Sequence, residues 1–430
     1  MDTITYVGGC GRLGLALAAW SAQVGYRVLC ADVNQTAIDT VNAGRSPHYE
    51  PEVGNLIARW HGQRLRATTD TTTAIRQSSL SVVVVPTPSR GDGSFSLDYV
   101  LAACQDIGAG LRDRPDYHVV IIASTVNPGD TAGPIRAVLE EASGLPAGRD
   151  WGLIYSPEFV RQGSIVHDFA HPSQVLIGEL DSPSGDAAEA YYCRIVDNGS
   201  PVHRMSLTSA EVAKIGLNTT IVIKMAVANQ LAWLCHAIPG TDAGDVLEAI
   251  GSDVRIGHKY FSAGLADGGP CLPRDGRALV AAADQWGTSV PIAEAADDFR
   301  EEQLDRLVNL VLREAQGRPI GILGLTYKPG TDIVEESPAL RLAGDLYRFG
   351  AATVWAYDPV IDQPTISFRT TLSLENLLEH AQVLVIATCW PEFKRLEHTP
   401  LPGKTIIDPW GFLDEEQLDC AKYVRLGRGT

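Results

Sequence analysis

The order of predicted elements in the first 32 residues constrains the fold of this chain more than any other feature. Residues 4–7 form a short apolar run that predicts a β-strand, and the alanine-rich stretch 15–24 predicts an α-helix. Between them lies the glycine-rich segment 9–14, which reads GCGRLG, and a second predicted strand at 27–31 ends at Asp32. Strand, glycine turn, helix, strand and acid, in this order, predict a parallel βαβ unit that binds a dinucleotide.

The chemistry of this unit predicts which dinucleotide is bound. Glycines let the backbone approach a pyrophosphate at the helix N-terminus, where N–H groups and the helix dipole favour an anion. The carboxylate of Asp32 would accept hydrogen bonds from ribose hydroxyls and repel a 2′-phosphate, so we expect NAD rather than NADP. The alternative is a glycine turn needed only for packing. The residues expected to contact the cofactor here are Gly9, Gly11, Arg12, Leu13, Gly14 and Asp32.

Strand-like and helical runs alternate along most of the chain, which predicts an α/β fold. The runs 82–85 and 119–123 read as buried parallel strands, and the polar residues after them place Thr87 and Thr125 towards the cofactor cleft. A second set of strand-like runs begins near residue 318, and Asp358 ends one of them as Asp32 does. The long helical pattern 207–235 between the two sets is expected to be a scaffold or dimer surface. We therefore predict two Rossmann-like doubly wound domains, at 1–200 and 313–430, joined by a central long-helix dimerisation region at 201–312.

Length, charge and cysteine usage limit the classes of function. At 430 residues the chain is expected to form two or three domains, and its net charge of −17 argues against nucleic acid or an anionic membrane as a partner. No apolar run approaches the roughly 20 residues of a membrane span, and the N-terminus does not resemble a signal peptide. The eight cysteines include no C-x-x-C pair, which fits a reducing cytoplasm and predicts no metal site.

The segment 268–275, GGPCLPRD, is typical of a reactive thiol. The cation of Arg274 would favour the thiolate of Cys271, and Asp275 follows directly as a carboxylate that can handle water. The alternative is that Cys271 is one more small buried apolar residue. A second polar pair, Lys214 and Asn218, lies four residues apart among apolar neighbours, hence on one side of the predicted long helix. By helix geometry alone, this lysine could equally be a surface residue with its apolar stem packed down.

Taken together, these segments resemble the UDP-glucose/GDP-mannose dehydrogenase family over nearly the whole chain. The resemblance depends on the order and spacing of GCGRLG at 9–14, VPTP at 85–88, STVNPGDT at 124–131, SPEFVRQG at 156–163, EVAKIGLN at 211–218 and GGPCLPRD at 268–275. It implies an N-terminal NAD domain, a central helical dimerisation region and a C-terminal nucleotide-sugar domain. It also implies a reaction, in which a sugar C6 alcohol is oxidised twice to a carboxylate by two NAD molecules.

Within that reaction, the resemblance gives each residue a role. Cys271 would capture the aldehyde as a thiohemiacetal that becomes a thioester, and Lys214 and Asn218 would stabilise the oxyanion. Asp275 would act as a base or orient the thiol and water, and Glu158 would assist hydrolysis of the thioester. Thr125 would position the cofactor and a water. Further contacts are expected with the cofactor from Thr87, Thr125, Glu158 and Arg274, and with the substrate from Phe159, Val160, Arg161, Lys214, Asn218, Arg255, Tyr260, Gly268 and Lys328. Of these, Arg255 resembles an arginine that reaches the sugar site of a neighbouring subunit, and its alternative is a solvated loop cation.

The chain departs from the family pattern mainly where a nucleotide would bind. Glu335 and Trp410 stand where the family usually has arginines, Ile333 replaces a second acid, and Asp267 occupies a position that is often aromatic. UDP-glucose is the expected substrate, while a UDP-N-acetylhexosamine, GDP-mannose or another nucleotide sugar remains open. Two other classes also remain open: a one-step hydroxy-acid dehydrogenase, and a non-catalytic nucleotide-sugar binding protein. A homodimer or higher homo-oligomer in the cytoplasm is expected.

Overall fold

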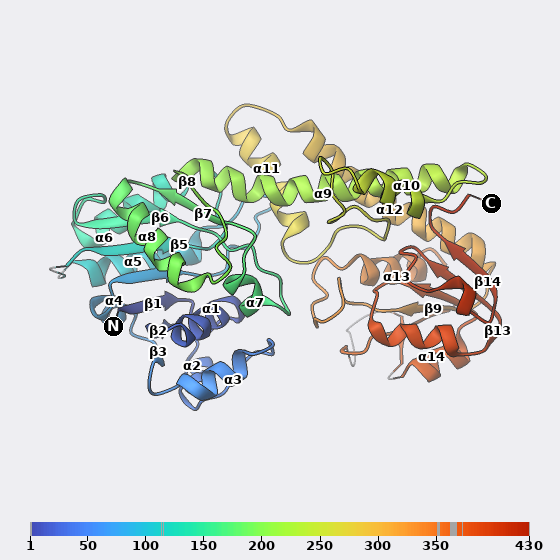
Figure 1. Cartoon of the computed structure of the whole chain (residues 1–430), viewed down its shortest axis with the longest axis horizontal. Coiled ribbons are helices and arrows are strands. Elements are labelled where there is room, and N and C mark those ends of the chain that lie inside the picture. Colours follow the sequence, from blue (N-terminus) through green and yellow to red (C-terminus); the bar gives the residue numbers. More distant parts are fainter. Residues whose placement is uncertain are drawn as a thin grey trace. The chain divides into compact units, whose positions relative to one another are not determined.

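The structure is a computed structural model that describes residues 2–112, 114, 116–350, 353–361, 368–371 and 373–429. The chain divides into two compact units, Met1–Ile215 and Gly216–Thr430, and each contains its own sheet (Figure 1).

The first unit is built on an eight-stranded sheet with the strand order β3-β2-β1-β4-β5-β6-β7-β8. All neighbouring strands are parallel except β6 and β7, which pair antiparallel. The strands are β1 (Thr3–Val7), β2 (Arg27–Ala31), β3 (Leu65–Thr68), β4 (Leu80–Val83), β5 (His118–Ile122), β6 (Trp151–Tyr155), β7 (Val175–Glu179) and β8 (Val202–Ser206).

Helices cover both faces of this sheet, because alternate residues of its strands enter two different cores. Tyr6 packs in the core that α1, α7 and α8 share, whereas Val7 packs in the core of α4, α5 and α6. The helices are α1 (Arg12–Gln23), α2 (Gln35–Asn42), α3 (Val53–Trp60), α4 (Thr71–Gln77), α5 (Asp98–Leu111), the π-helical turn η1 (Thr131–Ile135), α6 (Arg136–Ser143), α7 (Ile165–Ala170) and α8 (Ser182–Ile195).

The second unit contains a six-stranded sheet of parallel strands in the order β11-β10-β9-β12-β13-β14. One face packs against α12 and α13, and the other against α14 and the 3-10 turn η2. The strands are β9 (Ile320–Leu323), β10 (Val354–Tyr357), β11 (Arg369–Thr370), β12 (Val383–Ile386), β13 (Leu401–Asp408) and β14 (Cys420–Arg425). The helices are α10 (Ala243–Gly251), α11 (Leu272–Gln285), α12 (Pro291–Ala315), α13 (Pro338–Arg348), α14 (Leu374–His380), η2 (Pro391–His398) and η3 (Glu415–Gln417).

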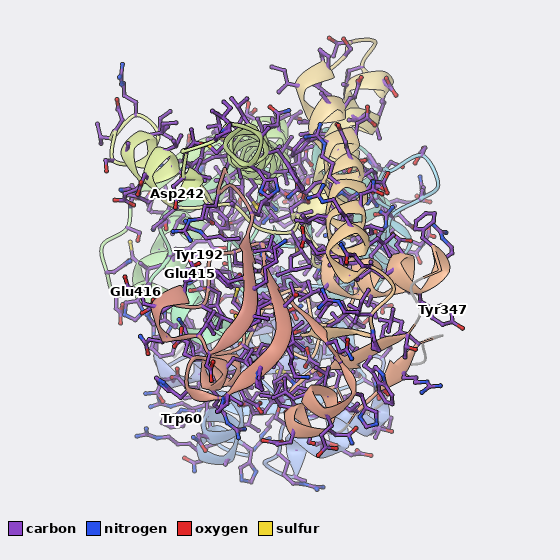
Figure 2. All side chains as sticks on the ribbon, turned by 90° about the vertical axis from the view of Figure 1, so that its right-hand side faces the viewer. Trp60, Tyr192, Asp242, Tyr347, Glu415 and Glu416 are labelled. Atoms are coloured by element: carbon purple, nitrogen blue, oxygen red, sulfur yellow. The ribbon has the colours of Figure 1, made fainter. Side chains whose placement is uncertain are left out.

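The long helix α9 (Leu207–Ala237) begins in the first unit and ends in the second. Within the second unit, Asp242 connects α10 with the last strand. Its side chain, labelled in Figure 2, caps α10 at Gly244 and forms an ion pair of 3.0 Å with Arg425 of β14. No helix in the described part of the chain has the length and apolar character that crossing a membrane requires.

The predicted fold class, α/β with two Rossmann-like sheets and a long central helix, is confirmed. Element boundaries differ slightly from the prediction. Helix α1 begins at Arg12 rather than Leu15, since Gly11 caps the helix and the motif supplies its first turn. Strand β4 ends at Val83, two residues before the predicted end, because Pro86 lacks the N–H that a continued strand would need. The division at 200 and 312 stays a prediction.

Candidate active site

Three glycines of the turn after β1, Gly8, Gly9 and Gly14, have no room for a Cβ atom. A Cβ atom on Gly14 would lie 2.4 Å from the carbonyl oxygen of Gly8, and one on Gly9 would lie 2.8 Å from Cα of Cys30. Gly8 itself has φ +80° and lies against the carbonyl of Val84, where a Cβ atom would be 2.3 Å away. The turn therefore keeps its backbone open at the N-terminus of α1, as a pyrophosphate site requires. Gly8 was missed by the sequence reasoning, although it directly precedes the motif.

Asp32 lies at the end of β2 and helps to shape this turn. Its Oδ2 accepts a hydrogen bond of 2.9 Å from the backbone N–H of Cys10, and its Oδ1 accepts one of 3.0 Å from that of Asn34. Each carboxylate oxygen has a second lone pair that could accept from a ribose hydroxyl. The Arg12 guanidinium donates to the Tyr49 carbonyl at 3.2 Å. The glycines and Asp32 thus fit NAD.

A hydroxyl links the loops that follow β4 and β5, where Thr87 and Thr125 were predicted to lie. The hydroxyl of Ser124 donates to the Val85 carbonyl at 2.7 Å and accepts from the Val85 N–H at 2.9 Å. Thr87 is buried and Thr125 is half-buried. Because β4 and β5 are neighbours, both threonines lie at the carboxyl edge of the sheet, where ligands of such folds bind.

The second half of the β5 loop is held by a buried acid from α9. Glu211 is fully buried, and its carboxylate accepts hydrogen bonds from the N–H groups of Gly129 at 2.6 Å and Thr131 at 2.8 Å. Burial raises the pKa of Glu211. Its role was not predicted, and the position of Glu211 three residues before Lys214 was the only signal in the sequence.

Glu158 lies after β6 and has an environment that favours its protonated form. Burial raises the pKa of its carboxyl to about 7, although the hydrogen bond from Tyr192 and the charge of Lys214 lower it. The Tyr192 hydroxyl, labelled in Figure 2, donates to Oε1 of Glu158 at 3.2 Å. A carboxyl group that titrates near neutral pH can exchange a proton with water in either direction.

Lys214 is not a surface residue, which removes the simpler of its two interpretations. Its side chain is 8% exposed, its Nζ donates to the carbonyl oxygen of Glu158 at 2.7 Å, and it lies 4.5 Å from the centre of the Phe159 ring. A buried ammonium group held in this way is suited to stabilising negative charge. Phe159 thus has a defined partner within the first unit.

Arg161, in contrast, forms an ion pair with a neighbouring acid. Its guanidinium makes a bidentate pair with Asp168, with Nε–Oδ2 at 3.0 Å and Nη2–Oδ1 at 2.9 Å. Burial opposes ionisation of Asp168, yet its bonds to Arg161 and Ser164 lower its pKa to about 2. Val160 is partly buried against the core of the first unit. Contacts of Val160 and Arg161 with a substrate therefore remain predictions.

In the second unit, Cys271 is the N-cap residue of α11, and its side chain is exposed. The dipole of this 14-residue helix favours a thiolate at its N-terminus, and the cationic residue Arg274 follows three residues later in the sequence. The interpretation of Cys271 as a buried apolar residue is therefore wrong for this structure. An exposed cysteine at a helix N-terminus is a suitable nucleophile.

Asp275, in the first turn of α11, is 1% exposed and has a defined orientation. Its Oδ2 accepts a hydrogen bond of 2.6 Å from Nδ2 of Asn218, and its Oδ1 lies 3.6 Å from Nε of Arg274. Oδ1 accepts no hydrogen bond from the residues that the structure describes. Asn218, Arg274 and Asp275 are thus brought together, and the latter two lie within four residues of Cys271 along the chain, while their roles stay predictions.

The glycines before Cys271 are required by close contacts. Gly269 has φ +84°, and a Cβ atom there would lie 2.6 Å from the Tyr327 ring, while one on Gly268 would lie 2.5 Å from Cδ of Pro338. The ammonium of Lys328, the next predicted substrate residue, is 5.6 Å from the centre of the Tyr327 ring. The loop 268–271 therefore rests on the segment 327–338 of the same unit.

The remaining predicted substrate residues of this unit lie on an exposed loop. Arg255 forms a bidentate pair with Asp253, with Nη2–Oδ2 at 2.6 Å, and its side chain is 84% exposed. Tyr260 is exposed and has φ +61°, a conformation that a residue with a Cβ atom rarely adopts. Nothing in this unit contradicts the solvated-cation interpretation of Arg255, and its role at a neighbouring subunit stays a prediction.

Two of the residues that depart from the family pattern, Trp410 and Asp267, pack against other residues of the second unit. Trp410 lies against Gly264, where a Cβ atom would be 2.1 Å from its ring, and Asp267 is buried, which raises its pKa to about 6. Glu335 is exposed. Asp358, although it ends β10 as Asp32 ends β2, is buried and accepts hydrogen bonds from the N–H groups of Leu325 and Thr326.

Comparisons with known proteins cover nearly the whole chain. The models of the UDP-glucose/GDP-mannose dehydrogenase family match in order: the NAD binding domain at 3–196, the central domain at 208–302 and the UDP binding domain at 321–415. The UDP-glucose 6-dehydrogenase AglM of Haloferax volcanii is 34% identical, over 95% of this chain and 98% of that protein. The GDP-mannose 6-dehydrogenase of Azotobacter vinelandii is 31% identical, over 97% of this chain and 98% of that protein. A solved UDP-glucose dehydrogenase from Pyrobaculum islandicum has a TM-score of 0.88 at 31% identity, and the match covers 99% of this chain and 97% of that one.

Proposed function

This chain belongs to the UDP-glucose/GDP-mannose dehydrogenase family and is an NAD-dependent nucleotide-sugar 6-dehydrogenase, and we propose that it oxidises UDP-glucose to the uronic acid through a thioester on Cys271. The observation that carries this proposal is the exposed thiol of Cys271 at the N-terminus of α11, one turn from the buried pair Asp275 and Asn218. A dehydrogenase that stops at an aldehyde or ketone has no use for such a nucleophile.

The residues of the second unit carry the covalent steps. The Cys271 thiolate adds to the C6 aldehyde, so a C–S bond forms and the carbonyl oxygen becomes the oxyanion of a thiohemiacetal. The glycine turn and Asp32 would hold NAD, which when bound would accept a hydride in each of the two oxidations, that of the alcohol and that of the thiohemiacetal to the thioester. Water then adds to the thioester carbon, the C–S bond breaks, and the carboxylate and the Cys271 thiolate are released.

Acid–base and electrostatic roles are assigned by the environment of each side chain. Lys214, a buried ammonium, stabilises the oxyanion, and Asn218 donates a hydrogen bond and holds Asp275 in place. Asp275 accepts a proton from the thiol or from water through its Oδ1. Glu158, with a pKa of about 7, takes the proton of the water that hydrolyses the thioester, and Thr125 orients this water.

We favour UDP-glucose over other nucleotide sugars because the UDP binding domain model matches and because UDP-glucose dehydrogenases are among the proteins to which the chain is similar. Arg255, Tyr260, Gly268 and Lys328 are assigned to the substrate. Glu335 and Trp410, in place of family arginines, bear on the base and sugar that are accepted. We assign a homodimer in the cytoplasm, with Arg255 completing the site of the partner.

Mass spectrometry of the products from a panel of UDP-, GDP- and TDP-hexoses, with NADH counted per sugar consumed, tests the proposal. A UDP-glucuronate product with about two NADH per sugar is expected. About one NADH per substrate would identify a single oxidation, and no NADH a binding protein. Faster turnover of GDP-mannose or a UDP-N-acetylhexosamine would correct the substrate and leave the chemistry in place.

A further inference from the structure

The backbone that leads to Cys271 is held by a residue distant in sequence. The N–H of Gly269, two residues before the thiol, donates a hydrogen bond of 3.3 Å to the carbonyl oxygen of Glu336. The same oxygen would lie 2.7 Å from a Cβ atom on Gly268. The carbonyl of Glu336 therefore lies directly against the two glycines that set the path of the chain into α11.

Glu336 presents this carbonyl from an unfavourable backbone conformation. Its φ is +49°, in the left-handed region, which a residue with a Cβ atom adopts only when the surrounding structure holds it there. The next residue, Ser337, is buried, caps α13 at Leu340 and donates its hydroxyl to the Leu325 carbonyl at 2.7 Å. The backbone that follows Glu336 is thus held in place by Ser337.

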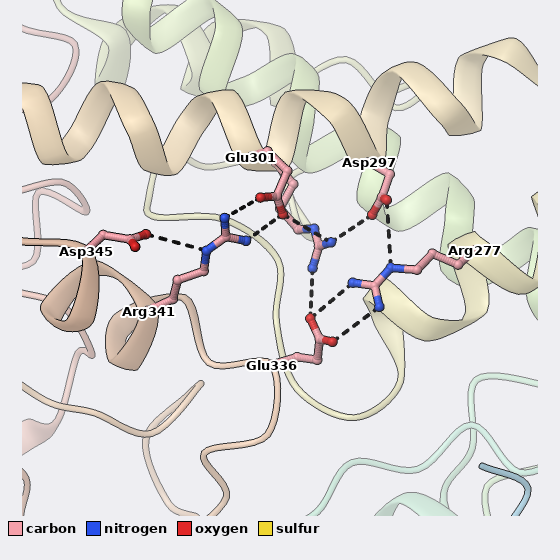
Figure 3. A network of polar contacts seen from close by, with 7 residues as sticks. Arg277, Asp297, Glu301, Glu336, Arg341 and Asp345 are labelled. Carbon is pink, nitrogen blue, oxygen red and sulfur yellow. Dashed lines mark hydrogen bonds and ion pairs between the residues drawn. The ribbon is translucent and has the colours of Figure 1, made fainter. Parts of the chain in front are cut away.

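The side chain of Glu336 is anchored by two arginines, as Figure 3 shows for Arg277. Arg277 makes a bidentate pair, with Nη1–Oε1 at 3.2 Å and Nη2–Oε2 at 3.1 Å, and Arg300 adds a bond of 3.1 Å to Oε2. Arg300 is buried, so this second bond is shielded from water. Although burial opposes ionisation of Glu336, its bonds to Arg277 and Arg300 lower its pKa, so the carboxylate stays charged.

Through Glu336, these contacts connect the loop before Cys271 with helix α11, which begins after it. Arg277 lies on α11, six residues after Cys271, and it holds the side chain of Glu336, whose carbonyl holds Gly269. The loop before the thiol and the helix after it are therefore fixed to the same residue. A shift of Glu336 would move the thiol away from the N–H groups of α11 that favour the thiolate.

We propose that Glu336 is a positioning residue for the proposed reaction: clamped by Arg277 and Arg300, it fixes the loop at Gly269 and so the place of the Cys271 thiol at the N-terminus of α11. The inference rests on the proposed function only for the use of this thiol, because the fixed position of Cys271 can be measured without turnover.

The network offers a matched pair of variants. Arg341 belongs to the same group of ion pairs in Figure 3, where it bonds Glu301 at 2.6 Å and lies 3.6 Å from Asp345, and it resembles Arg277 in exposure. Arg277→Ala breaks the clamp on Glu336, whereas Arg341→Ala removes an equivalent surface arginine that does not contact it. Glu336→Asn removes the carboxylate while keeping a residue that tolerates left-handed backbone.

The test measures the rate at which iodoacetamide alkylates Cys271, followed by peptide mass spectrometry, together with kcat, KM for NAD and Tm. In Arg277→Ala and Glu336→Asn, alkylation of Cys271 should slow about threefold or more and kcat should fall about tenfold to a hundredfold, with an unchanged KM for NAD. Arg341→Ala should stay within about twofold of the parent in both rates. Alkylation at the parent rate in Arg277→Ala and Glu336→Asn would overturn the inference, as would an equal loss in Arg341→Ala. Full activity of Cys271→Ser would refute the proposed function instead, and the alkylation rates would still decide the position of the thiol.

Discussion

Nδ2 of Asn218 donates a hydrogen bond of 2.6 Å to Oδ2 of Asp275, a carboxylate that is almost completely buried. This bond occupies one carboxylate oxygen of Asp275. The other oxygen, Oδ1, accepts no hydrogen bond from the described residues and lies 3.6 Å from Nε of Arg274. Asn218, which we propose as a donor to the reaction oxyanion, therefore also fixes the orientation of the acid that follows Cys271 by four residues in the sequence.

Asn218→Ala is expected to affect stability and turnover together. It leaves a buried carboxylate oxygen without its donor, which should lower the free energy of unfolding by about 1–3 kcal/mol. Denaturant unfolding measures this change, and steady-state kinetics should show a fall in kcat of about tenfold or more, because Asp275 loses its orientation. Thr220→Ala, at an exposed position on the same helix, is the control. Unchanged stability of Asn218→Ala would contradict the role of this bond.

Asp32 should make the enzyme prefer NAD over NADP. Its carboxylate, fixed by the N–H groups of Cys10 and Asn34, would repel a 2′-phosphate. Initial rates at matched cofactor concentrations should favour NAD by about a hundredfold, and Asp32→Asn should reduce the preference by removing the charge. Equal rates of the parent enzyme with both cofactors would refute the assignment.

Hydrolysis of the thioester should depend on the ionisation of Glu158. The base form exists above its pKa of about 7, so the rate of hydrolysis should rise with pH through this value and fall below it. Tyr192→Phe removes a hydrogen bond that stabilises the carboxylate, so the pKa should rise and the profile should move to higher pH. Single-turnover release of the acid, measured across pH, shows the shift.

Two variants make this test specific. Tyr191→Phe removes a neighbouring buried hydroxyl that bonds Tyr6 rather than Glu158, and its profile should follow that of the parent more closely. Glu158→Gln should let the thioester accumulate on Cys271, visible by intact-protein mass after a quench. A profile of Tyr192→Phe that coincides with the parent would exclude the Tyr192 hydroxyl as a determinant of the Glu158 pKa.

Local patterns were sufficient to predict the two sheets, the long helix and the NAD binding domain. The glycine turn and the segment around Cys271 are each continuous in sequence and could be recognised as motifs, although bonds to distant residues, such as those of Cys10 to Asp32 and of Gly269 to Glu336, help to hold them. Contacts between distant residues were not predictable. The bond of Tyr192 to Glu158 spans 34 residues, and the clamp of Arg277 on Glu336 spans 59. Tyrosine and glutamate are ordinary residue types, so nothing in the composition points to Tyr192 or Glu336. The left-handed backbone of Glu336 could not be predicted either, because the residue is not a glycine.

The thioester on Cys271 makes the most direct prediction for the reaction as a whole. Cys271→Ser retains a hydroxyl at the N-terminus of α11, but a serine hydroxyl stays protonated at neutral pH and an alkoxide is a poorer leaving group than a thiolate. The second oxidation should not be completed, so the variant should yield no more than about one NADH per sugar and no free carboxylate.

Cys193→Ser, at the other exposed cysteine of the described chain, is the matched control, because it lies on α8 in the first unit and should leave the yield at about two NADH per sugar. Product analysis by mass spectrometry and NADH absorbance at completion distinguish the two variants. Lys214→Ala should differ from both: it keeps the thiol, so the product should remain the carboxylate, while kcat falls about a hundredfold with the loss of the buried ammonium. Normal carboxylate production by Cys271→Ser would exclude covalent catalysis by this residue, because no step of the proposed chemistry can proceed past the aldehyde without the C–S bond.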